Sequence, residues 1–275
     1  MEEVKIIQKK ILELLKVFIN ICEQNNLTYY ALGGTLLGAV RHEGFIPWDD
    51  DIDLGMPRED YEKLKKIASK ELNGRYLFLS EDSLGYRKAF SVIRDTSTKI
   101  IMNYSNVEQE ESLWIDIFPI DGLPGNKVDK FIQEKKYLYR RMMVQLSQFD
   151  TIVNQNKPNR PYYEKIIINV AKILKIEKLL SFEKEQKKYL NTIKKYSLKE
   201  AYAGNYTGAY KLREIVPTNY FGKPQKLKFE GIDLCVPYKF REYLCAIYGE
   251  NYMELPPVEQ RVPHQYKIIN LGEES

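Results

Sequence analysis

The chain has 275 residues and a nearly balanced charge, with 42 lysines and arginines against 38 aspartates and glutamates. This length allows one large domain or two small ones, and 44% hydrophobic with 29% charged residues excludes a disordered, collagen-like or coiled-coil chain. Three cysteines without a Cys-x-x-Cys pair and only two histidines argue against a disulfide scaffold, a cysteine zinc site and a His-rich metal centre.

The first half of the chain alternates helix and strand patterns. Apolar periodicity and the positions of Gly and Pro predict, in order, a helix over 7–22, a strand over 27–32, a short helix over 36–40, a strand over 48–56, a helix from Pro57, and strands over 76–80, 90–94, 99–104 and 113–117. A turn is expected at Asp121–Gly125. The pattern is typical of an α+β core.

The second half is dominated by Lys-rich amphipathic segments. They predict helices over 127–149, 161–179 and 182–196, then short strands over 226–229 and 234–236 and a helix over 239–248. We expect a catalytic core over 1–125 and a helical, substrate-side region over 126–275, packed on the core as one unit.

No segment predicts export or membrane insertion. Glu2 and Glu3 stand where a signal peptide would be basic, and the longest apolar tract, 166–176, is interrupted by polar residues. The sequence therefore predicts a cytoplasmic protein, with peripheral contact at the inner face of the cytoplasmic membrane left open.

An acidic run, Trp48-Asp49-Asp50-Asp51-Ile52-Asp53, lies between aromatic and apolar residues. Alternation along a strand would place Asp49, Asp51 and Asp53 on one face. Three carboxylates repel each other unless a cation neutralises them, and Mg²⁺ is a suitable ion. An EF-hand is excluded because Leu54 stands at its glycine position.

Paired glycines, Gly33-Gly34, precede Thr35 and lie upstream of the acidic run. Such a turn lets phosphate oxygens approach backbone N–H groups. Together with the Asp-x-Asp strand, and with Asp116 between two isoleucines as a third carboxylate, this order resembles the nucleotidyltransferase fold shared with polymerase beta. That resemblance implies a mixed-sheet core with flanking helices.

Residues 31–64 resemble the LicD family more closely, and the likeness extends to Arg94-Asp95, Trp114–Asp121 and a C-terminal block that includes His264. This family includes bacterial phosphocholine transferases and fukutin-related ribitol-phosphate transferases. The resemblance implies transfer of a phosphoryl-alcohol unit from a CDP-activated donor to a sugar hydroxyl of a cell-surface glycan precursor, of teichoic acid, lipopolysaccharide or capsule type. The zinc of fukutin-related protein is not carried over, because Cys22, Cys235 and Cys245 form no matching cluster.

On this interpretation Asp49, Asp51 and Asp53 hold one or two Mg²⁺ ions, with Mn²⁺ as a substitute, and Asp116 acts as general base or as a further metal ligand. The remaining candidates fall into two groups. The donor-phosphate group is Gly33, Gly34, Thr35, Arg41 and Arg94. The substrate-binding group is His42, Lys88, Tyr202, Tyr206, Tyr210, Arg261 and His264, with the three tyrosines as an aromatic cage for a choline head group.

The expected partners are a CDP-activated alcohol and a glycan or lipid-linked glycan acceptor, with no nucleic acid, since the chain has no basic patch interleaved with aromatics. Phosphocholine is the first candidate for the transferred unit. Ribitol phosphate and glycerol phosphate are alternatives. Two further alternatives are a nucleotidyltransferase of the same fold that adds NMP to a small molecule or protein, and a non-catalytic binding module.

Overall fold

The computed structural model describes residues 2–102, 109–149, 162, 166, 169, 176–263 and 266–272. Its α-helices are α1 (Glu2–Gln24), α2 (Gly33–His42), α3 (Arg58–Glu71), α4 (Lys127–Leu146), α7 (Ile176–Leu179), α8 (Phe182–Ile193) and α9 (Phe240–Tyr248). Its strands are β1 (Tyr30–Ala31), β2 (Asp53–Pro57), β3 (Tyr76–Leu79), β4 (Ser91–Asp95), β5 (Lys99–Met102), β6 (Gln109–Glu111), β7 (Trp114–Leu123), β8 (Tyr202–Asn205), β9 (Ile215–Pro217), β10 (Gln225–Phe229), β11 (Ile232–Val236) and β12 (Tyr266–Asn270). The predicted α+β class and mixed sheet are confirmed within these residues.

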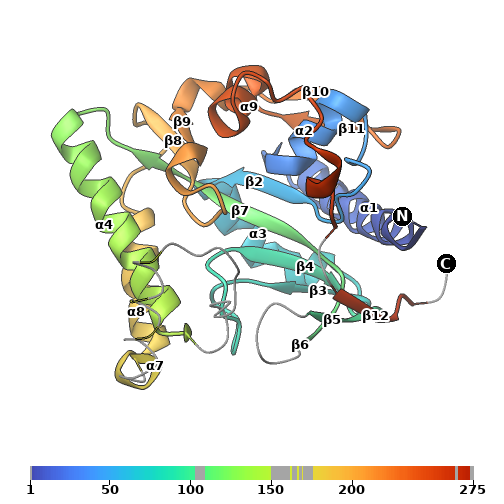
Figure 1. The fold of residues 1–275 in the computed structure, drawn as a ribbon, viewed down its shortest axis with the longest axis horizontal. Coiled ribbons are helices and arrows are strands. Elements are labelled where there is room, and N and C mark those ends of the chain that lie inside the picture. The colour runs from blue at the N-terminus through green and yellow to red at the C-terminus, as the bar shows by residue number, and fades with distance from the viewer. Residues whose placement is uncertain are drawn as a thin grey trace.

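A mixed sheet with seven strands in the described chain organises the molecule (Figure 1). Its order is β1-β2-β7-β4-β3, and β8 joins the far end of β7 and pairs in turn with β9. Strands β2 and β7 are parallel, while the other pairs in this sheet are antiparallel. Two smaller sheets, β10-β11 and β12-β5-β6, complete the strand pairing.

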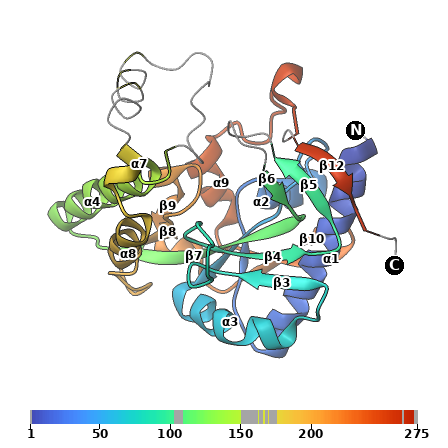
Figure 2. The same ribbon diagram turned by 90° about the horizontal axis from the view of Figure 1, so that it is seen from below.

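Helices α1 and α3 contact each other and cover one face of the sheet (Figure 2). The apolar stripe of α1 is buried there, and Leu14, Leu15 and Phe18 have no exposed surface. Ile115 and Ile117 of β7 and Leu54 of β2 belong to the same hydrophobic core. Because side chains alternate along a strand, Asp53 and Asp116 point to the opposite face.

Strand β7 is longer than predicted. It continues through Pro119 to Leu123, where a turn was expected, because its second half pairs with β8. Gly122 allows this, since a methyl group there would lie 1.9 Å from the carbonyl oxygen of Ser197. Buried Asp121 is fixed by Arg58, whose Nε lies 2.8 Å from Asp121 Oδ1. This ion pair joins the start of α3 to β7.

The acidic run is only partly a strand. β2 begins at Asp53, so Asp49 and Asp51 lie in the preceding loop, where the sequence predicted a strand from Trp48. Gln8 of α1 holds this loop by donating from Nε2 to the carbonyl oxygens of Ile46 (3.2 Å) and Asp49 (2.7 Å). Alternation along a strand therefore does not explain the arrangement of all three aspartates.

Helices α4 and α8 pack together at one end of the molecule (Figure 1). Asn126 caps α4 by accepting from the N–H groups of Val128 and Asp129, and Ser181 caps α8. Beneath them lies a second core of Leu123, Tyr137, Tyr189, Ile193 and Tyr206. Most of the helix predicted over 161–179 lies outside the described residues. Within the described residues, none of the helices combines the length and apolar character needed to cross a membrane.

Candidate active site

The site is built around two aspartates in register on adjacent parallel strands. Asp53 of β2 pairs with Asp116 of β7, and the Asp116 N–H donates to the carbonyl oxygen of Ile52 at 2.9 Å. Side chains directly opposite each other in a sheet share a face and lie close together. The two carboxylates are therefore neighbours although 63 positions separate them in the chain.

The N-terminus of α2 lies against these carboxylates. The Asp53 N–H donates to Thr35 Oγ1 at 2.9 Å, and the Leu32 N–H donates to the Asp53 carbonyl oxygen at 2.9 Å. A methyl group at Gly33 would lie 2.9 Å from Asp53 Oδ2, and one at Gly34 would lie 2.5 Å from Asp49 Oδ2. Both glycines are thus needed for the close approach of helix and carboxylates.

The predicted Gly33-Gly34 turn is the first turn of α2 itself. Gly33 has a positive φ of 49°, which glycine adopts without strain. No side chain in the described chain caps the helix at Leu32. The first N–H groups of a helix favour negative charge, so this turn can accept phosphate oxygens as well as the nearby carboxylates.

Crowding of negative charge is the main electrostatic feature of the site. The pKa of Asp53 is raised well above its usual value by loss of hydration, then by Asp51, Asp116, Asp49 and Glu214. Each neighbouring carboxylate disfavours the ionised form of Asp53. Without a cation, this cluster holds its charges at a free-energy cost.

The donor set fits a hard divalent cation. Asp49, Asp51 and Asp53 offer carboxylate oxygens, which Mg²⁺ prefers, and a cation would relieve the repulsion on Asp53. Within the described part of the chain, no group of three or more acidic, histidine or cysteine side chains is placed so that it could hold a metal ion. Mg²⁺ commonly completes its coordination with water and substrate phosphate oxygens, so an ion at these carboxylates would depend on such additional ligands.

Two basic residues lie near the cluster, Lys88 in the segment before β4 and Arg94 on β4. Lys88 Nζ lies 3.8 Å from Asp116 Oδ1 and 4.6 Å from the centre of the Trp114 ring. Arg94 is on β4 but forms an ion pair with Glu111 at 2.5 Å. Lys88 is therefore beside the predicted general base, whereas the guanidinium of Arg94 is already paired with a carboxylate.

Glu214 and Tyr248 lie near Asp53, and the sequence did not identify either as a candidate. Burial raises the pKa of Glu214 to about 7, although its Oε1 accepts a hydrogen bond from the Tyr210 N–H at 2.9 Å. Tyr210 and Tyr248 form an edge-to-face pair with ring centres 5.3 Å apart. Burial raises the pKa of both phenols, and Asp53 adds to both shifts.

No local pattern distinguishes these two residues. Glu214 ends a short 3-10 helix, Lys211–Glu214, and the charged sequence of this segment indicates a solvent-exposed position. Tyr248 is one of 21 tyrosines. They come together because α9 packs against both α2 and the 3-10 helix Lys211–Glu214.

Arg41 and His42 lie at the other end of α2 from the glycines, about 12 Å along the helix axis at about 1.5 Å per residue. Arg41 Nη1 donates to the carbonyl oxygens of Tyr252 (3.1 Å) and Glu254 (3.0 Å). Its Nε donates to His42 Nε2 at 3.0 Å. Arg41 therefore joins the C-terminal segment to α2, and its binding of donor phosphate stays a prediction.

The three tyrosines predicted as a cage do not converge. Tyr206 is fully buried in the second core, and its hydroxyl donates to the carbonyl oxygen of Gly122. Tyr202 is on β8, where Lys130 Nζ lies 3.5 Å from its ring centre. Only Tyr210 lies by the acidic cluster, because strand β8 and the following turns break the helical spacing.

Arg261 stacks on Trp48, with its Cζ 5.3 Å from the ring centre, and its Nε donates to the carbonyl oxygen of Pro256. Trp48 directly precedes Asp49, so Arg261 adjoins the acidic loop through an aromatic contact. His264 lies outside the described residues.

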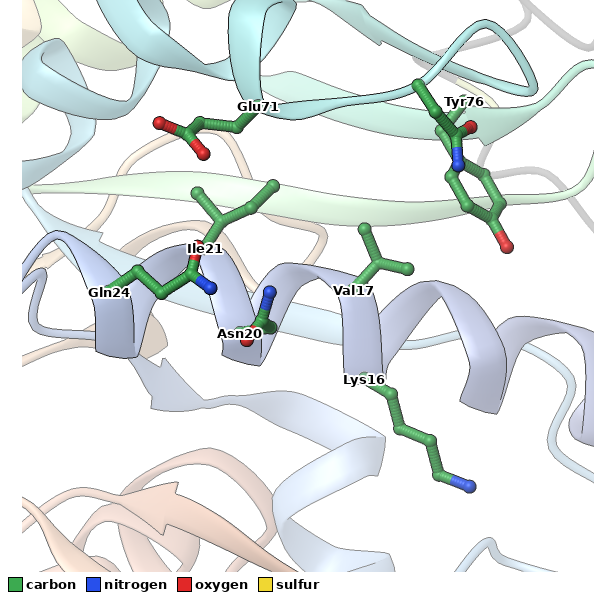
Figure 3. Close-up of a pocket in the computed structure, with 8 residues that line it drawn as sticks. Lys16, Val17, Asn20, Ile21, Gln24, Glu71 and Tyr76 are labelled. Atoms are coloured by element: carbon green, nitrogen blue, oxygen red, sulfur yellow. The ribbon is translucent and has the colours of Figure 1, made fainter.

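An open groove of about 370 Å³ lies elsewhere, between α1 and the 71–76 segment (Figure 3). Val17 and Ile21 line one wall, and Glu71 and Tyr76 line the other. Lys16 points away from it in this view. The groove shares no residue with the acidic cluster and lacks convergent charges, so its size does not make it the active site.

Acidic side chains on adjacent parallel strands, beside an uncapped helix N-terminus, define a site suited to phosphate chemistry. Residues 26–152 match the family described as "LicD/FKTN/FKRP, nucleotidyltransferase domain". The chain belongs to the LicD family and is a phosphotransferase.

Individual relatives agree with this assignment. The chain is 33% identical over 260 residues to the lipopolysaccharide cholinephosphotransferase LicD of Haemophilus influenzae, a match that covers 92% of each chain. An uncharacterized protein of Rickettsia prowazekii is 28% identical over 64% of this chain and 63% of its own. Human ribitol 5-phosphate transferase FKRP is 37% identical over 59 residues, which are 22% of this chain and 12% of its own.

Proposed function

We propose that this protein transfers phosphocholine from CDP-choline to a sugar hydroxyl of a cell-surface glycan precursor and releases CMP, on a nucleotidyltransferase-like core. The observation that carries the proposal is the in-register pair Asp53 and Asp116 at the N-terminus of α2. It occurs in a chain that aligns along nearly its whole length with a cholinephosphotransferase.

In the proposed reaction the acceptor hydroxyl oxygen forms a bond to the phosphorus that carries the alcohol. The bond from that phosphorus to the bridging oxygen breaks, CMP leaves, and the hydroxyl proton passes to the carboxylate of Asp116. Phosphoryl transfer depends mainly on positioning and charge neutralisation. Bound Mg²⁺, held by Asp49, Asp51 and Asp53, would supply charge neutralisation at the diphosphate.

The other groups have supporting tasks. The N–H groups of the first turn of α2 orient donor phosphate, which Gly33 and Gly34 allow to approach closely. Lys88, 3.8 Å from Asp116, supplies positive charge where the acceptor and phosphate meet. Tyr210 and Tyr248 present aromatic surface near Asp53, and this arrangement suits a trimethylammonium group, which aromatic rings attract.

Ribitol phosphate is the second candidate for the transferred unit. The match to ribitol 5-phosphate transferase supports it, but that match spans only 59 residues. The carboxylates would serve the diphosphate of either donor, so the head group must be selected elsewhere. The Tyr210–Tyr248 pair favours a cation over a polyol.

A thermal-shift screen tests donor and metal together. CDP-choline, CDP-ribitol, CDP-glycerol and nucleoside triphosphates are each added with and without Mg²⁺. A ligand at a hundredfold excess over its dissociation constant stabilises the folded state by about 2.7 kcal/mol. We expect the largest Mg²⁺-dependent shift with CDP-choline, whereas a shift confined to triphosphates would refute the proposed donor.

Product analysis separates transfer from nucleotidylation. Phosphocholine transfer releases CMP, while addition of NMP to an acceptor releases pyrophosphate. Pyrophosphate as the product would assign the same carboxylates to a nucleotidyltransferase.

A further inference from the structure

The outer face of α4 carries solvent-exposed apolar side chains. Five of them, which we call the α4 stripe, are between 43% and 65% exposed: Val128, Phe131, Ile132, Tyr139 and Met142. Their spacing places them on one side of the helix. Contiguous exposed apolar surface of this kind commonly marks an interaction site.

The fold does not require this stripe. The opposite side of α4 anchors the helix: Tyr137 is fully buried, and Gln133 Nε2 donates to the carbonyl oxygen of Thr192 at 2.6 Å. Arg141 Nη1 donates to the carbonyl oxygen of Tyr206 at 3.1 Å. The helix is thus fixed from within, and it lies at one edge of the molecule in both views (Figures 1 and 2).

Positive charge accompanies the stripe. Helix α4 has six basic and two acidic residues, a surplus equal to the net charge of +4 of the whole chain. Lys127, Lys135 and Lys136 are exposed on or beside the stripe, with Asp129 as the exposed acid. Lys135 Nζ lies 5.2 Å from the centre of the Phe131 ring, so an ammonium sits directly over the apolar surface.

We propose that α4 docks this protein on an anionic lipid surface, with the α4 stripe buried at the headgroup boundary and Lys127, Lys135 and Lys136 at the phosphates. Amphipathic helices with aromatic and aliphatic side chains on one face and lysines beside them bind in this way. Each lysine near an anionic membrane adds electrostatic attraction to the lipid headgroups. A second copy of the chain would bring like charges together, so charge complementarity favours the lipid.

The test is co-sedimentation of the full-length protein with lipid vesicles. We expect binding to mixed phosphatidylcholine–phosphatidylglycerol vesicles, weaker binding to phosphatidylcholine alone, and a decrease at high salt. Phe131→Ser with Ile132→Ser, and separately Lys135→Glu with Lys136→Glu, should each lower the partition coefficient at least about tenfold. Circular dichroism and melting temperature report whether each variant is folded.

Matched controls lie on other surfaces. Leu84→Ser removes an exposed leucine outside α4, and Lys66→Glu with Lys70→Glu makes the same charge change on α3. Both should bind vesicles like the parent protein. Equal loss in these controls, absence of anionic-vesicle binding, or a dimer that dissociates in the Phe131→Ser, Ile132→Ser variant without lipid binding would overturn the proposal. Turnover with a water-soluble acceptor should be unchanged in the α4 variants, and this readout separates the lipid proposal from the proposed reaction.

Discussion

Replacing Glu214 by glutamine tests whether the buried charge near the acidic cluster is as unfavourable as the structure indicates. Glu214 is 5% exposed, and its pKa rises from 4.5 to about 7, chiefly by burial. The folded protein therefore holds this proton more tightly than the unfolded chain. Stability contributed by the group is complete below about pH 4.5 and is lost as the pH rises through about 7.

The size of the effect follows from the pKa difference. A shift of about 2.5 pH units at about 1.36 kcal/mol each gives a total cost of about 3 kcal/mol for ionised Glu214. By two-state linkage, about 2.5 kcal/mol of this stability is lost when the pH rises from about 5 to about 8. Hydrogen bonds from the Tyr210 N–H and the Asn205 side chain already oppose the shift, as does the positive charge of Arg141.

The assay is urea unfolding of the parent protein and of Glu214→Gln at both pH values, without Mg²⁺. Glutamine keeps an acceptor for the Tyr210 N–H but cannot ionise, so the variant should lack about 2–3 kcal/mol of the parent's pH dependence. The variant also loses the hydrogen bond to Asn205. This loss lowers its free energy of unfolding at both pH values and cancels when the two free energies are subtracted. Glu71→Gln, at an exposed carboxylate of α3, is the control and keeps the parent's pH dependence. Equal pH dependence in the parent protein and in Glu214→Gln would refute the reasoning.

The remaining predictions concern turnover and donor choice. Asp51→Asn and Asp53→Asn should each abolish turnover, while the metal-free protein stays as stable or becomes more stable because a crowded negative charge is removed. Turnover at the parent rate in saturating Mg²⁺ would exclude the metal assignment. Asp116→Asn should slow the reaction by about 10²–10⁴-fold while donor affinity is retained, as measured by single-turnover kinetics and by titration with CDP-choline and Mg²⁺. If Mg²⁺-dependent donor affinity falls together with the rate, Asp116 is a metal ligand. If neither the rate nor the affinity falls, Asp116 is a structural carboxylate. Tyr210→Leu should weaken CDP-choline binding by about 2- to 30-fold relative to CDP-glycerol, measured by calorimetry, and equal weakening of both donors would remove the aromatic contact with choline.

Local patterns predicted much of the fold. The apolar spacing in α1 and the Pro57 start of α3 correspond closely to the structure, because each depends on neighbours in the sequence. The length of β7 was not predicted, because Pro119 and Gly122 indicate a turn. Pairing with β8, from about 80 positions further on, decides that region, and such pairing leaves no local signal.

The same distinction applies to the site. Asp53, Asp116 and the two glycines could be found because strand and turn patterns placed them, and the structure brings them together. The three tyrosines predicted as a cage do not converge, because a spacing of four implies a helix where the chain forms β8 and a turn. Glu214 depends on burial, and burial is a property of the folded chain.

Strand β7 connects the two proposals physically. Asp116 lies near its start, its last residue is Leu123, and α4 begins four positions later at Lys127. Paired strands on both sides hold β7, with β2 and β4 along its first half and β8 along its second. At about 3.3 Å per residue, the strand spans about 23 Å from Asp116 to Leu123. A protein docked through α4 would therefore hold its acidic cluster at a fixed distance from the lipid, and an acceptor anchored in that surface would have to extend its sugar far enough to reach Asp116.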